Sequence, residues 1–480
     1  EQLSPGTVRH HVTTAVRLHA TGDPVLFRAV LQHIVDADPS LRTTFVEEDG
    51  QPFRRVHDHA EVALEVIDAS NWSREEIDEH LTQEHLRTYD IEEGPLVRFL
   101  GLSLSEREHI LVIGMHHLIT DLWSNAVLGY LIAVTYQAMA NGTTSPELEQ
   151  QATYTDFVEA ERSLLTSANS VGTLDYWRPL FSSWTPQDLI SDRPGGDQLT
   201  GIGSVHQIDV DDDLAAALHR VAGERQLSVK SMVLAAYQAA LHRAHGLDQV
   251  VVAEIKANRS VRDARSIGCY MNPIARRVSF EPGLTLGSLA DEVNRSGAES
   301  RSHERFPFGR LLHELRPGHG TSPFFAASFS WQKTARVVPS STVGKLALGE
   351  SGDEANIEGF DLEPYVMPIR SAPLPLSLLA AGSRDHLELA VEYQTERFQP
   401  GSIERFSRHL VTILRAMVNS PELGVDDVDL ISESERAARR AEWEAVKRPI
   451  DDRLTVHHLV ENQAASSPGA IADRDAHAES

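Results

Sequence analysis

The most constraining feature of this sequence is a short apolar segment, residues 110–115, that is followed at once by two histidines. The segment has the length and composition of a β-strand that is buried on both faces of a sheet. After Asp121 the apolar residues recur with a helical period, up to an Asn-Gly pair at 141–142 that is typical of a helix C-terminus. His116 and His117 therefore lie where a buried strand ends and the chain turns toward a helix, a position that can hold a side chain rigidly beside a cleft.

His117 is the candidate catalytic residue, because an imidazole titrates near neutral pH and can take a proton from an incoming nucleophile. Strand alternation places the side chain of His116 on the opposite face, so we expect His116 to be structural. From the residues alone, a structural histidine is an equally good interpretation of His117, since the HHxxxD pattern is short. Asp121 either orients the His117 ring or forms an ion pair with an arginine from elsewhere in the chain.

Composition limits the classes of protein to which the chain can belong. A net charge of −26 argues against nucleic acid and against an anionic membrane surface as partners. The single cysteine, Cys269, excludes an internal disulfide and fits a reducing cytoplasm. The longest apolar run, residues 128–136, is too short to span a bilayer. We therefore expect a cytoplasmic protein or a fragment of one. No P-loop, Rossmann or HExxH motif is present, so we predict neither a nucleotide site nor a metal site.

The 480 residues exceed what one hydrophobic core organises, so we expect at least two lobes. Strand and helix signals are mixed and do not strictly alternate, which favours an α+β fold with a mixed sheet. Residues 96–102 and 110–115 have the pattern of hairpin partners. A segment rich in Ser, Pro, Gly and Asp follows residue 181 and predicts a lobe boundary there. We assign residues 1–180 to an N-terminal lobe, 181–430 to a C-terminal lobe, and 431–480 to a linker and the start of a further domain.

The histidine pair belongs to the segment HHLITDLWS at residues 116–124. Further short motifs are spread along the chain: LRTTF at 41–45, YTDF at 154–157, DYW at 175–177, NR at 258–259, IGCYMNP at 267–273, HERFPF at 303–308 and SPFF at 322–325. In their order and wording these segments resemble the motifs of nonribosomal peptide synthetase condensation domains, whose signature HHxxxDGxS corresponds to residues 116–124. That family belongs to the chloramphenicol-acetyltransferase-like superfamily. Residues 454–472 resemble the beginning of an adenylation domain.

The resemblance implies two chloramphenicol-acetyltransferase-like lobes that form a V-shaped pseudo-dimer, with the histidine motif at their junction. The implied reaction is amide-bond formation between a donor acyl or peptidyl thioester and the α-amine of an acceptor aminoacyl thioester. Both substrates would arrive on phosphopantetheine arms, one from an upstream donor and one from a downstream acceptor peptidyl carrier protein. The chain has no carrier-type GGxS serine, so the arms come from other domains, and no cofactor is bound by the chain itself. An adenylation domain in the same chain would be a further partner.

The resemblance also assigns roles to individual residues. His117 would be the residue tied to catalysis, and Asp121 would pair with an arginine, with Arg259 as the first candidate and Arg42 as the second. His116 and Leu122 complete the motif. Candidates for the substrate tunnel are Trp123, Ser124, Gly268, Tyr270, Asn272, Ser330 and Gln332. The glycine at 268 would permit a close approach of backbone to ligand.

One departure from the family pattern supports an alternative function. Leu122 stands where the family motif has glycine, and a leucine side chain there narrows the donor channel or impairs the reaction. The chain is then a catalytically impaired platform that recruits carrier proteins or tailoring enzymes. An epimerisation domain is a second alternative, disfavoured because an adenylation-like segment follows. A free-standing acyltransferase that uses a soluble acyl thioester is a third.

Overall fold

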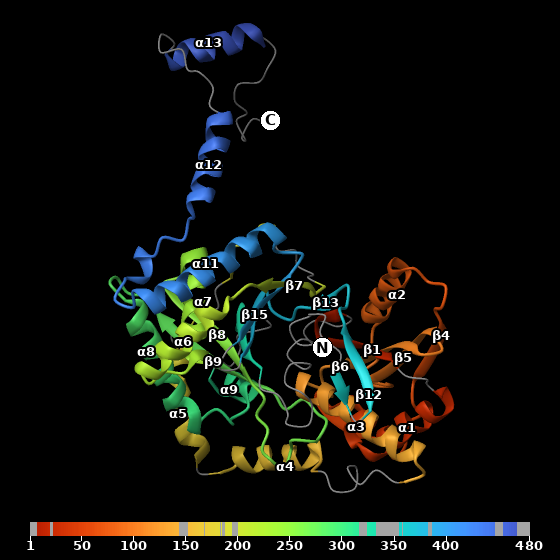
Figure 1. The fold of residues 1–480 in the computed structure, drawn as a ribbon. Coiled ribbons are helices and arrows are strands. Elements are labelled where there is room, and N and C mark those ends of the chain that lie inside the picture. Colours follow the sequence, from red (N-terminus) through yellow and green to blue (C-terminus); the bar gives the residue numbers. More distant parts are fainter. Residues whose placement is uncertain are drawn as a thin grey trace, which may run out of the picture. The chain divides into compact units, whose positions relative to one another are not determined.

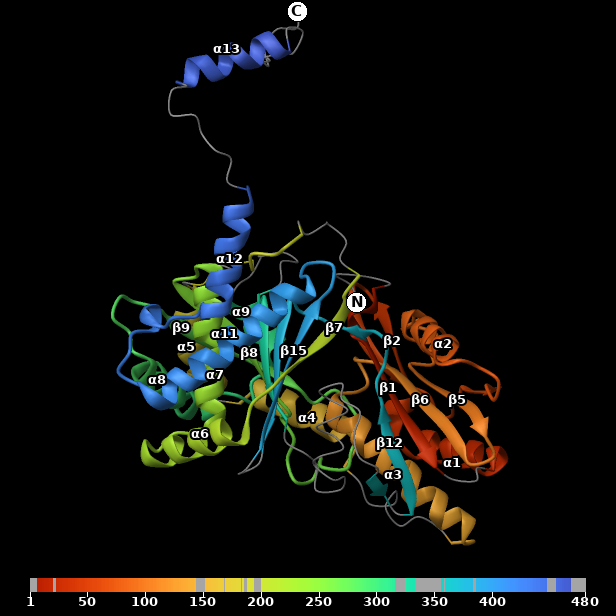
Figure 2. The ribbon, with the colours of Figure 1, turned by 45° about the horizontal axis from the view of Figure 1, so that its top comes forward.

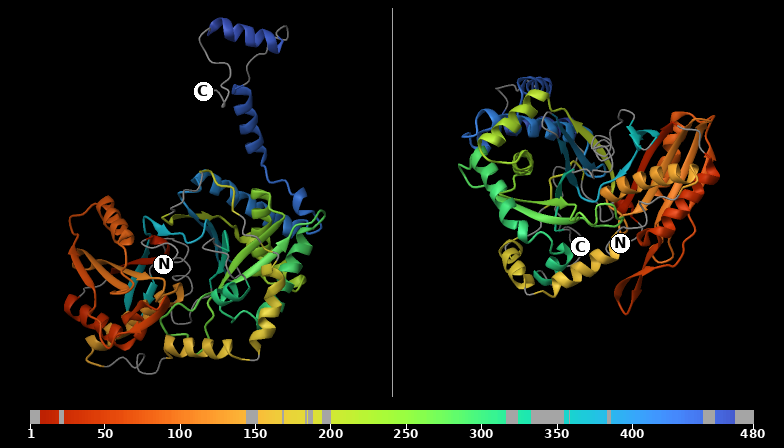
Figure 3. Two further views of the ribbon diagram at one scale, coloured as in Figure 1. Left: turned by 180° about the vertical axis from the view of Figure 1, so that it is seen from behind. Right: turned by 60° about the horizontal axis from the view of Figure 1, so that its bottom comes forward.

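The computed structural model describes residues 7–19, 23–143, 152–167, 169–182, 184, 188–193, 200–315, 324–332, 355–357, 359–382, 386–446 and 455–467. The chain divides into two compact units, Glu1–Val428 and Asp429–Ser480. The first unit contains two large β-sheets with helices packed on them, and each sheet forms the centre of one lobe (Figures 1 and 3). The predicted mixed α+β fold with two lobes is confirmed.

The first lobe is organised around a six-stranded sheet in the order β11-β12-β1-β6-β5-β4. All neighbouring strands are antiparallel except β4 and β5, which are parallel. The strands are β1 (His11–His19), β4 (Leu64–Asp68), β5 (Val97–Ser105), β6 (Glu108–His116), β11 (Ala355–Ile357) and β12 (Phe360–Tyr365). The helices are α1 (Pro24–Ala37), α2 (Arg74–Leu86) and α3 (Leu122–Ala140), and a small hairpin is formed by β2 (Thr43–Glu48) and β3 (Gln51–Val56).

Strand β6 is buried on both faces, as its apolar sequence predicts. Leu111, Ile113 and Met115 pack in one core cluster with residues of α1 and α3. Ile110 and Val112 pack in another cluster, on the opposite face, with residues of α2. The predicted hairpin is confirmed, because β5 and β6 are antiparallel partners. The two histidines therefore lie at the end of this central strand.

The second lobe is organised around a seven-stranded mixed sheet in the order β13-β7-β15-β14-β10-β8-β9. The strands are β7 (Ile202–Ile208), β8 (Gln249–Lys256), β9 (Asn272–Ser279), β10 (Ala327–Trp331), β13 (Arg370–Ser371), β14 (Leu376–Gly382) and β15 (Leu387–Gln394). The helices that precede or accompany them are α4 (Tyr154–Leu165), α5 (Asn169–Ser182), α6 (Asp212–Glu224), α7 (Val229–His245), α8 (Leu286–Glu299), α9 (Phe308–Leu315) and α11 (Pro400–Asn419).

Two elements cross the predicted lobe limit at residue 180. Most of helix α5 lies before that limit, yet Trp177 packs against residues of β8 and β9 in the second lobe. Strand β12 lies after the limit, yet it pairs with β1 at the edge of the first sheet, with Leu18 opposite Leu362 (Figure 2). The limits of the lobes stay a prediction, but one cut in the sequence cannot separate the two sheets.

The second unit contains α12 (Glu433–Val446) and α13 (Val456–Ser466). Helix α13 covers part of the segment that resembles the start of an adenylation domain, and the last residues of that segment lie outside the described residues. No helix among the described residues has both the length and the apolar character needed to cross a bilayer.

Candidate functional site

The two histidines lie at the end of β6 and differ in their surroundings. The backbone N–H of His116 donates to the carbonyl of Leu96 (2.9 Å) and that of His117 to the carbonyl of His10 (2.7 Å). His116 is 2% exposed, and its ring lies 5.8 Å from the Tyr89 ring and 6.4 Å from the His11 ring. The side chain of His116 is thus enclosed in the first lobe, as a structural residue would be.

His117, in contrast, is half-buried and lines a cavity of about 190 Å³. The wall of this cavity includes Arg9 and His85 of the first lobe and Arg370 and Glu392 of the second-sheet strands β13 and β15. The cavity therefore lies between the lobes, and the imidazole of His117 is not sealed in either core.

Asp121 connects the histidine motif to the second lobe. It is the N-cap of α3, where Oδ1 accepts the backbone N–H of Ser124 (2.8 Å). The same oxygen accepts Nη2 of Arg259 at 2.9 Å, in an ion pair whose side chains are 7% and 3% exposed. The other oxygen, Oδ2, accepts the backbone N–H of Tyr270 (3.1 Å). The structure brings Asp121 together with the first predicted partner, whereas Arg42 donates to the carbonyl of His57.

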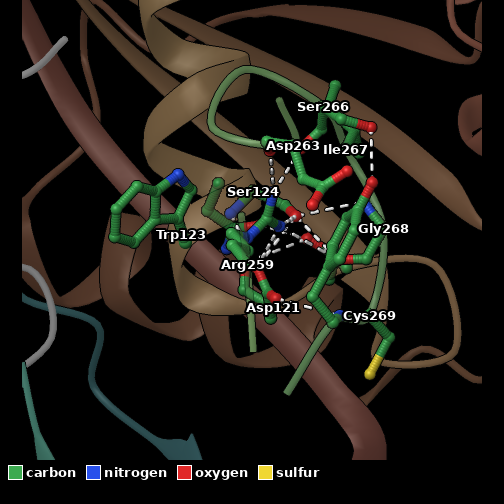
Figure 4. A network of polar contacts seen from close by, with 12 residues as sticks. Asp121, Trp123, Ser124, Arg259, Asp263, Ser266, Ile267, Gly268 and Cys269 are labelled. Carbon is green, nitrogen blue, oxygen red and sulfur yellow. Dashed lines mark hydrogen bonds and ion pairs between the residues drawn. The ribbon is translucent and has the colours of Figure 1, made fainter. Parts of the chain in front are cut away.

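Arg259 fixes the loop between β8 and β9 (Figure 4). Its Nη1 donates to the carbonyls of Asp263 (2.9 Å) and Ser266 (2.6 Å), and its Cζ lies 3.9 Å from the centre of the Tyr270 ring. A buried ion pair with these additional hydrogen bonds has its charges compensated, and removal of one partner would leave the other charge buried alone. Asp121 and Arg259 therefore act as a clamp between the two lobes.

Ser124 and Tyr154 complete the clamp around Gly268. The Ser124 hydroxyl lies 2.7 Å from the carbonyl of Gly268 and accepts its backbone N–H at 3.0 Å. A Cβ on residue 268 would lie 2.3 Å from Cδ2 of Tyr154, so this glycine is required by the tyrosine ring. Gly268 thus makes room for the Tyr154 ring, and its predicted approach to a ligand stays a prediction. The Tyr154 hydroxyl also donates to the carbonyl of Cys269 (2.9 Å).

This clamped turn places the thiol of Cys269 beside the key imidazole. Sγ lies 3.8 Å from Nδ1 of His117, within the range of a weak hydrogen bond to sulfur. Burial, with a smaller contribution from the Asp121 carboxylate, raises the pKa of Cys269 to about 12. The thiol is therefore protonated at neutral pH, and we propose that it donates to Nδ1. In that arrangement the His117 ring would carry its own proton on Nε2.

We expect the protonated state of Cys269 to be visible as slow labelling by iodoacetamide. A rise of the thiol pKa from an ordinary value near 9 to about 12 lowers the thiolate fraction at pH 8 by about 1000-fold. Because the chain has one cysteine, mass spectrometry of the intact protein reports this thiol alone. Labelling in denaturant is the control. Native labelling at the rate of the unfolded chain would contradict the proposed donor role of the thiol.

The remaining tunnel candidates form hydrogen bonds within and between loops, and their place in a substrate tunnel stays a prediction. Trp123 Nε1 donates to the carbonyl of Ala264 (2.9 Å), and the Tyr270 hydroxyl donates to Ser266 Oγ (2.7 Å). The Asn272 amide donates to the carbonyls of Glu304 and Phe306 and accepts the N–H of Phe308. Gln332 Nε2 donates to Ser330 Oγ (3.0 Å). Two of the described residues that were predicted for the site, His117 and Leu122, line the cavity between the lobes.

Sequence reasoning missed four ionisable residues of the cavity wall, Arg9, His85, Arg370 and Glu392. None of them lies in a motif, so the sequence carried no signal for them. Burial lowers the pKa of His85 to about 4, which leaves its ring neutral at physiological pH. Burial also raises the pKa of Glu392, which lies 3.8 Å from Nη2 of Arg370.

Comparison with known proteins assigns the family. The family model described as "Condensation domain" matches residues 1–438, so the chain belongs to the condensation-domain family. Chondramide synthase cmdD of Chondromyces crocatus is 27% identical over 478 residues, which are 98% of this chain and 12% of that protein. Bacitracin synthase 3 of Bacillus licheniformis is 25% identical over 471 residues, which are 97% of this chain and 7% of that protein. The chain thus spans a small part of these relatives.

Solved structures share the fold at low sequence identity. The X-domain from teicoplanin biosynthesis has a TM-score of 0.78 and 19% identity, and the match covers 89% of this chain and 94% of the X-domain. A four-domain nonribosomal peptide synthetase bound to AMP and glycine has a TM-score of 0.79 and 18% identity, over 96% of this chain and 35% of that one. The first condensation domain of the calcium-dependent antibiotic synthetase has a TM-score of 0.70 and 19% identity, over 90% and 96% of the two chains.

Proposed function

We propose that this chain is a condensation domain that forms an amide bond between a donor acyl or peptidyl thioester and the α-amine of an acceptor aminoacyl thioester. The observation that carries the proposal is the placement of His117, whose imidazole lines a cavity between the two lobes of a chain in the condensation-domain family. A thioester is already activated, so a site that holds two tethered reactants in the right orientation supplies much of the rate.

The reaction balances without a further reagent. The nitrogen of the acceptor amine attacks the thioester carbon, the C–N bond forms, the C–S bond breaks, and one amine proton passes to the departing sulfur as a free thiol forms. The contact between Cys269 and Nδ1 supports a ring of His117 that carries its proton on Nε2. Such a ring donates a hydrogen bond to the oxygen on which negative charge develops, which is a role in stabilising the transition state. In this tautomer Nε2 is not available as a general base.

Partners and neighbouring domains belong to the same proposal. We infer that the substrates arrive on phosphopantetheine arms of an upstream donor and a downstream acceptor carrier protein, with no cofactor held by this chain. Residues 431–480 would connect to an adenylation domain, and each lobe would be of the chloramphenicol-acetyltransferase type. Among the described residues, no group of three or more His, Cys, Asp and Glu is placed to hold a metal ion.

The proposed function is tested by reconstitution with two carrier proteins. The donor carrier is loaded with an acyl or aminoacyl thioester and the acceptor carrier with an aminoacyl thioester. Mass spectrometry of the acceptor carrier is expected to show the combined mass of both groups and release of the donor thiol. Loss of product when either carrier is left unloaded is the control. A donor group that is released as free acid, with no product on the acceptor carrier, would overturn the proposal.

A second candidate function is a catalytically impaired platform that recruits carrier proteins or tailoring enzymes. Leu122 favours it, because this side chain replaces the motif glycine and lines the same cavity as His117. The two functions differ in the behaviour of the wild-type domain, which forms product in the first and none in the second.

We expect Leu122→Gly to raise the rate of amide formation with bulky donors more than with small ones, because it removes a four-carbon side chain from the cavity wall. Glycine near a helix N-terminus costs at most about 1 kcal/mol of stability, so the variant should fold. Leu122→Met, which keeps the volume, is the matched control. Initial rates with acetyl and long-chain acyl donors measure the effect. An equal response of both donors would show that Leu122 does not limit the space for the substrate.

A further inference from the structure

Arg9 is a charged residue of the cavity wall that the proposed function does not yet use. It lies in the short 3-10 helix η1 (Val8–His10), just before β1, and it lines the same cavity as His117. Its Nε is buried and has no hydrogen-bond partner among the described residues. A buried donor of this kind calls for a ligand, an ion or ordered water.

The stem of Arg9 is held by the second lobe. Gly201 has φ +84°, and a Cβ at that position would lie 2.2 Å from Cγ of Arg9. The chain at residue 201 therefore packs directly on this stem, which only glycine allows. The Ser371 hydroxyl donates to the carbonyl of Val8, and the Ala372 N–H donates to the carbonyl of Gly201 (2.8 Å). These contacts fix the segment that carries Arg9, so the guanidinium is positioned beside the cavity.

Among the described residues, the cavity wall offers Arg9 no carboxylate that is not already close to another arginine. The described residues of the wall include one acidic side chain, that of Glu392. Its Oε2 lies 3.8 Å from Nη2 of Arg370. The neighbouring His85 is buried and neutral, because burial lowers its pKa to about 4. His11 contacts the carbonyl of His85 through Nδ1 (2.8 Å). A cavity with an excess positive charge is unexpected in a chain with a net charge of −26, so composition does not explain it.

We propose that Arg9 binds a carboxylate carried by the substrate that reacts at His117, so that this domain selects an acyl or aminoacyl group with an acidic side chain. This inference rests on the proposed function. A guanidinium matches a carboxylate with two parallel hydrogen bonds, which gives both strength and orientation. The phosphate of a phosphopantetheine arm is an alternative source of the anion. It is disfavoured because one cavity of about 190 Å³ contains both Arg9 and His117, whereas the length of the arm separates phosphate from thioester.

The inference is tested with phosphate-free substrates. N-acetylcysteamine thioesters with aspartyl, asparaginyl, glutamyl and glutaminyl groups are offered in the donor and in the acceptor role. The wild-type domain is expected to prefer an acid over its amide in one of the two roles. Arg9→Gln is expected to lower kcat/KM for that acid by about 10-fold to 100-fold, the range of a lost charge-assisted hydrogen bond, and to leave the amide within about twofold. Arg17→Gln, on the outer part of β1, is the matched control and should change neither substrate.

Each other outcome overturns the inference in a distinct way. An equal loss for acids and amides would assign Arg9 a structural role. A loss that occurs only with phosphopantetheine-linked substrates would assign the anion to the phosphate. If the wild-type domain forms no amide at all, the proposed function fails. A binding measurement then tests the carboxylate site by itself. Ligand-observed NMR with the α-amides of N-acetylaspartate and N-acetylasparagine, which differ only in the side-chain carboxylate, is then expected to show binding of the acid alone, lost in Arg9→Gln. Binding of both or of neither would contradict the carboxylate site.

Discussion

Replacement of His117 by alanine is expected to lower kcat for amide formation by about 100-fold to 1,000-fold, the range for loss of one hydrogen-bond donor to a developing negative charge, with KM for the loaded carriers nearly unchanged. The imidazole lines the cavity between the lobes, and its loss removes the one ring that is positioned there by both the backbone and the thiol of Cys269. Single-turnover kinetics with both carriers loaded measure the chemical step and separate it from binding.

The tautomer proposed for His117 is tested in the same assay. His117→Gln keeps an N–H donor near the position of the ring and should retain more activity than His117→Ala, whereas a general base could not be replaced in this way. His386→Ala is the matched control, because His386 is an exposed histidine of the second lobe that is paired with Asp212. Wild-type activity of His117→Ala would refute a catalytic role of the imidazole and favour the platform function.

Replacement of Arg259 by methionine is expected to lower the free energy of unfolding by about 3–5 kcal/mol. The change leaves the carboxylate of Asp121 buried, and it frees the carbonyls of Asp263 and Ser266 from their donor. The double variant Asp121→Asn/Arg259→Met removes both charges and should be less destabilised than the sum of the two single variants. Urea unfolding followed by tryptophan fluorescence measures all four proteins.

Arg220→Met is the matched control for this clamp. Arg220 pairs with Glu224 on the surface of α6, with side chains 58% and 60% exposed, and such a pair contributes about 0.5 kcal/mol or less. A loss of stability in Arg259→Met as small as that in Arg220→Met would show that the ion pair between the lobes is dispensable.

The sequence predicted the central strand and the turn of the site because both depend on local pattern. Six residues from Ile110 to Met115 are enough to specify a strand buried on both faces, and the motif that follows places His117 at its end. The pairing of Asp121 with Arg259 spans 138 positions and was indicated by the family resemblance. Spacing alone left it open.

The wall of the cavity could not be predicted in the same way. Arg9 and Glu392 line the same cavity because the two lobes lie side by side there. Neither residue belongs to a sequence motif that could have indicated this. The contact that requires a glycine at position 268 was hidden for a similar reason, since the ring belongs to Tyr154, more than 100 positions earlier. Asn272 was assigned to a tunnel, although its amide is occupied by the loop that contains Glu304 and Phe306. Contacts between distant segments decide all three cases.

The pairing of β12 with β1 has a consequence for biosynthesis. On the ribosome, β1 and β6 emerge early, whereas residues 360–365 are translated more than 200 codons after β6. Until then one side of β1 presents unpaired N–H and C=O groups, the kind of edge that invites association with other nascent chains. The sheet of the first lobe can therefore be completed only after most strands of the second sheet have been translated. A stalled or truncated product would keep this exposed edge, and we expect chaperones to bind it.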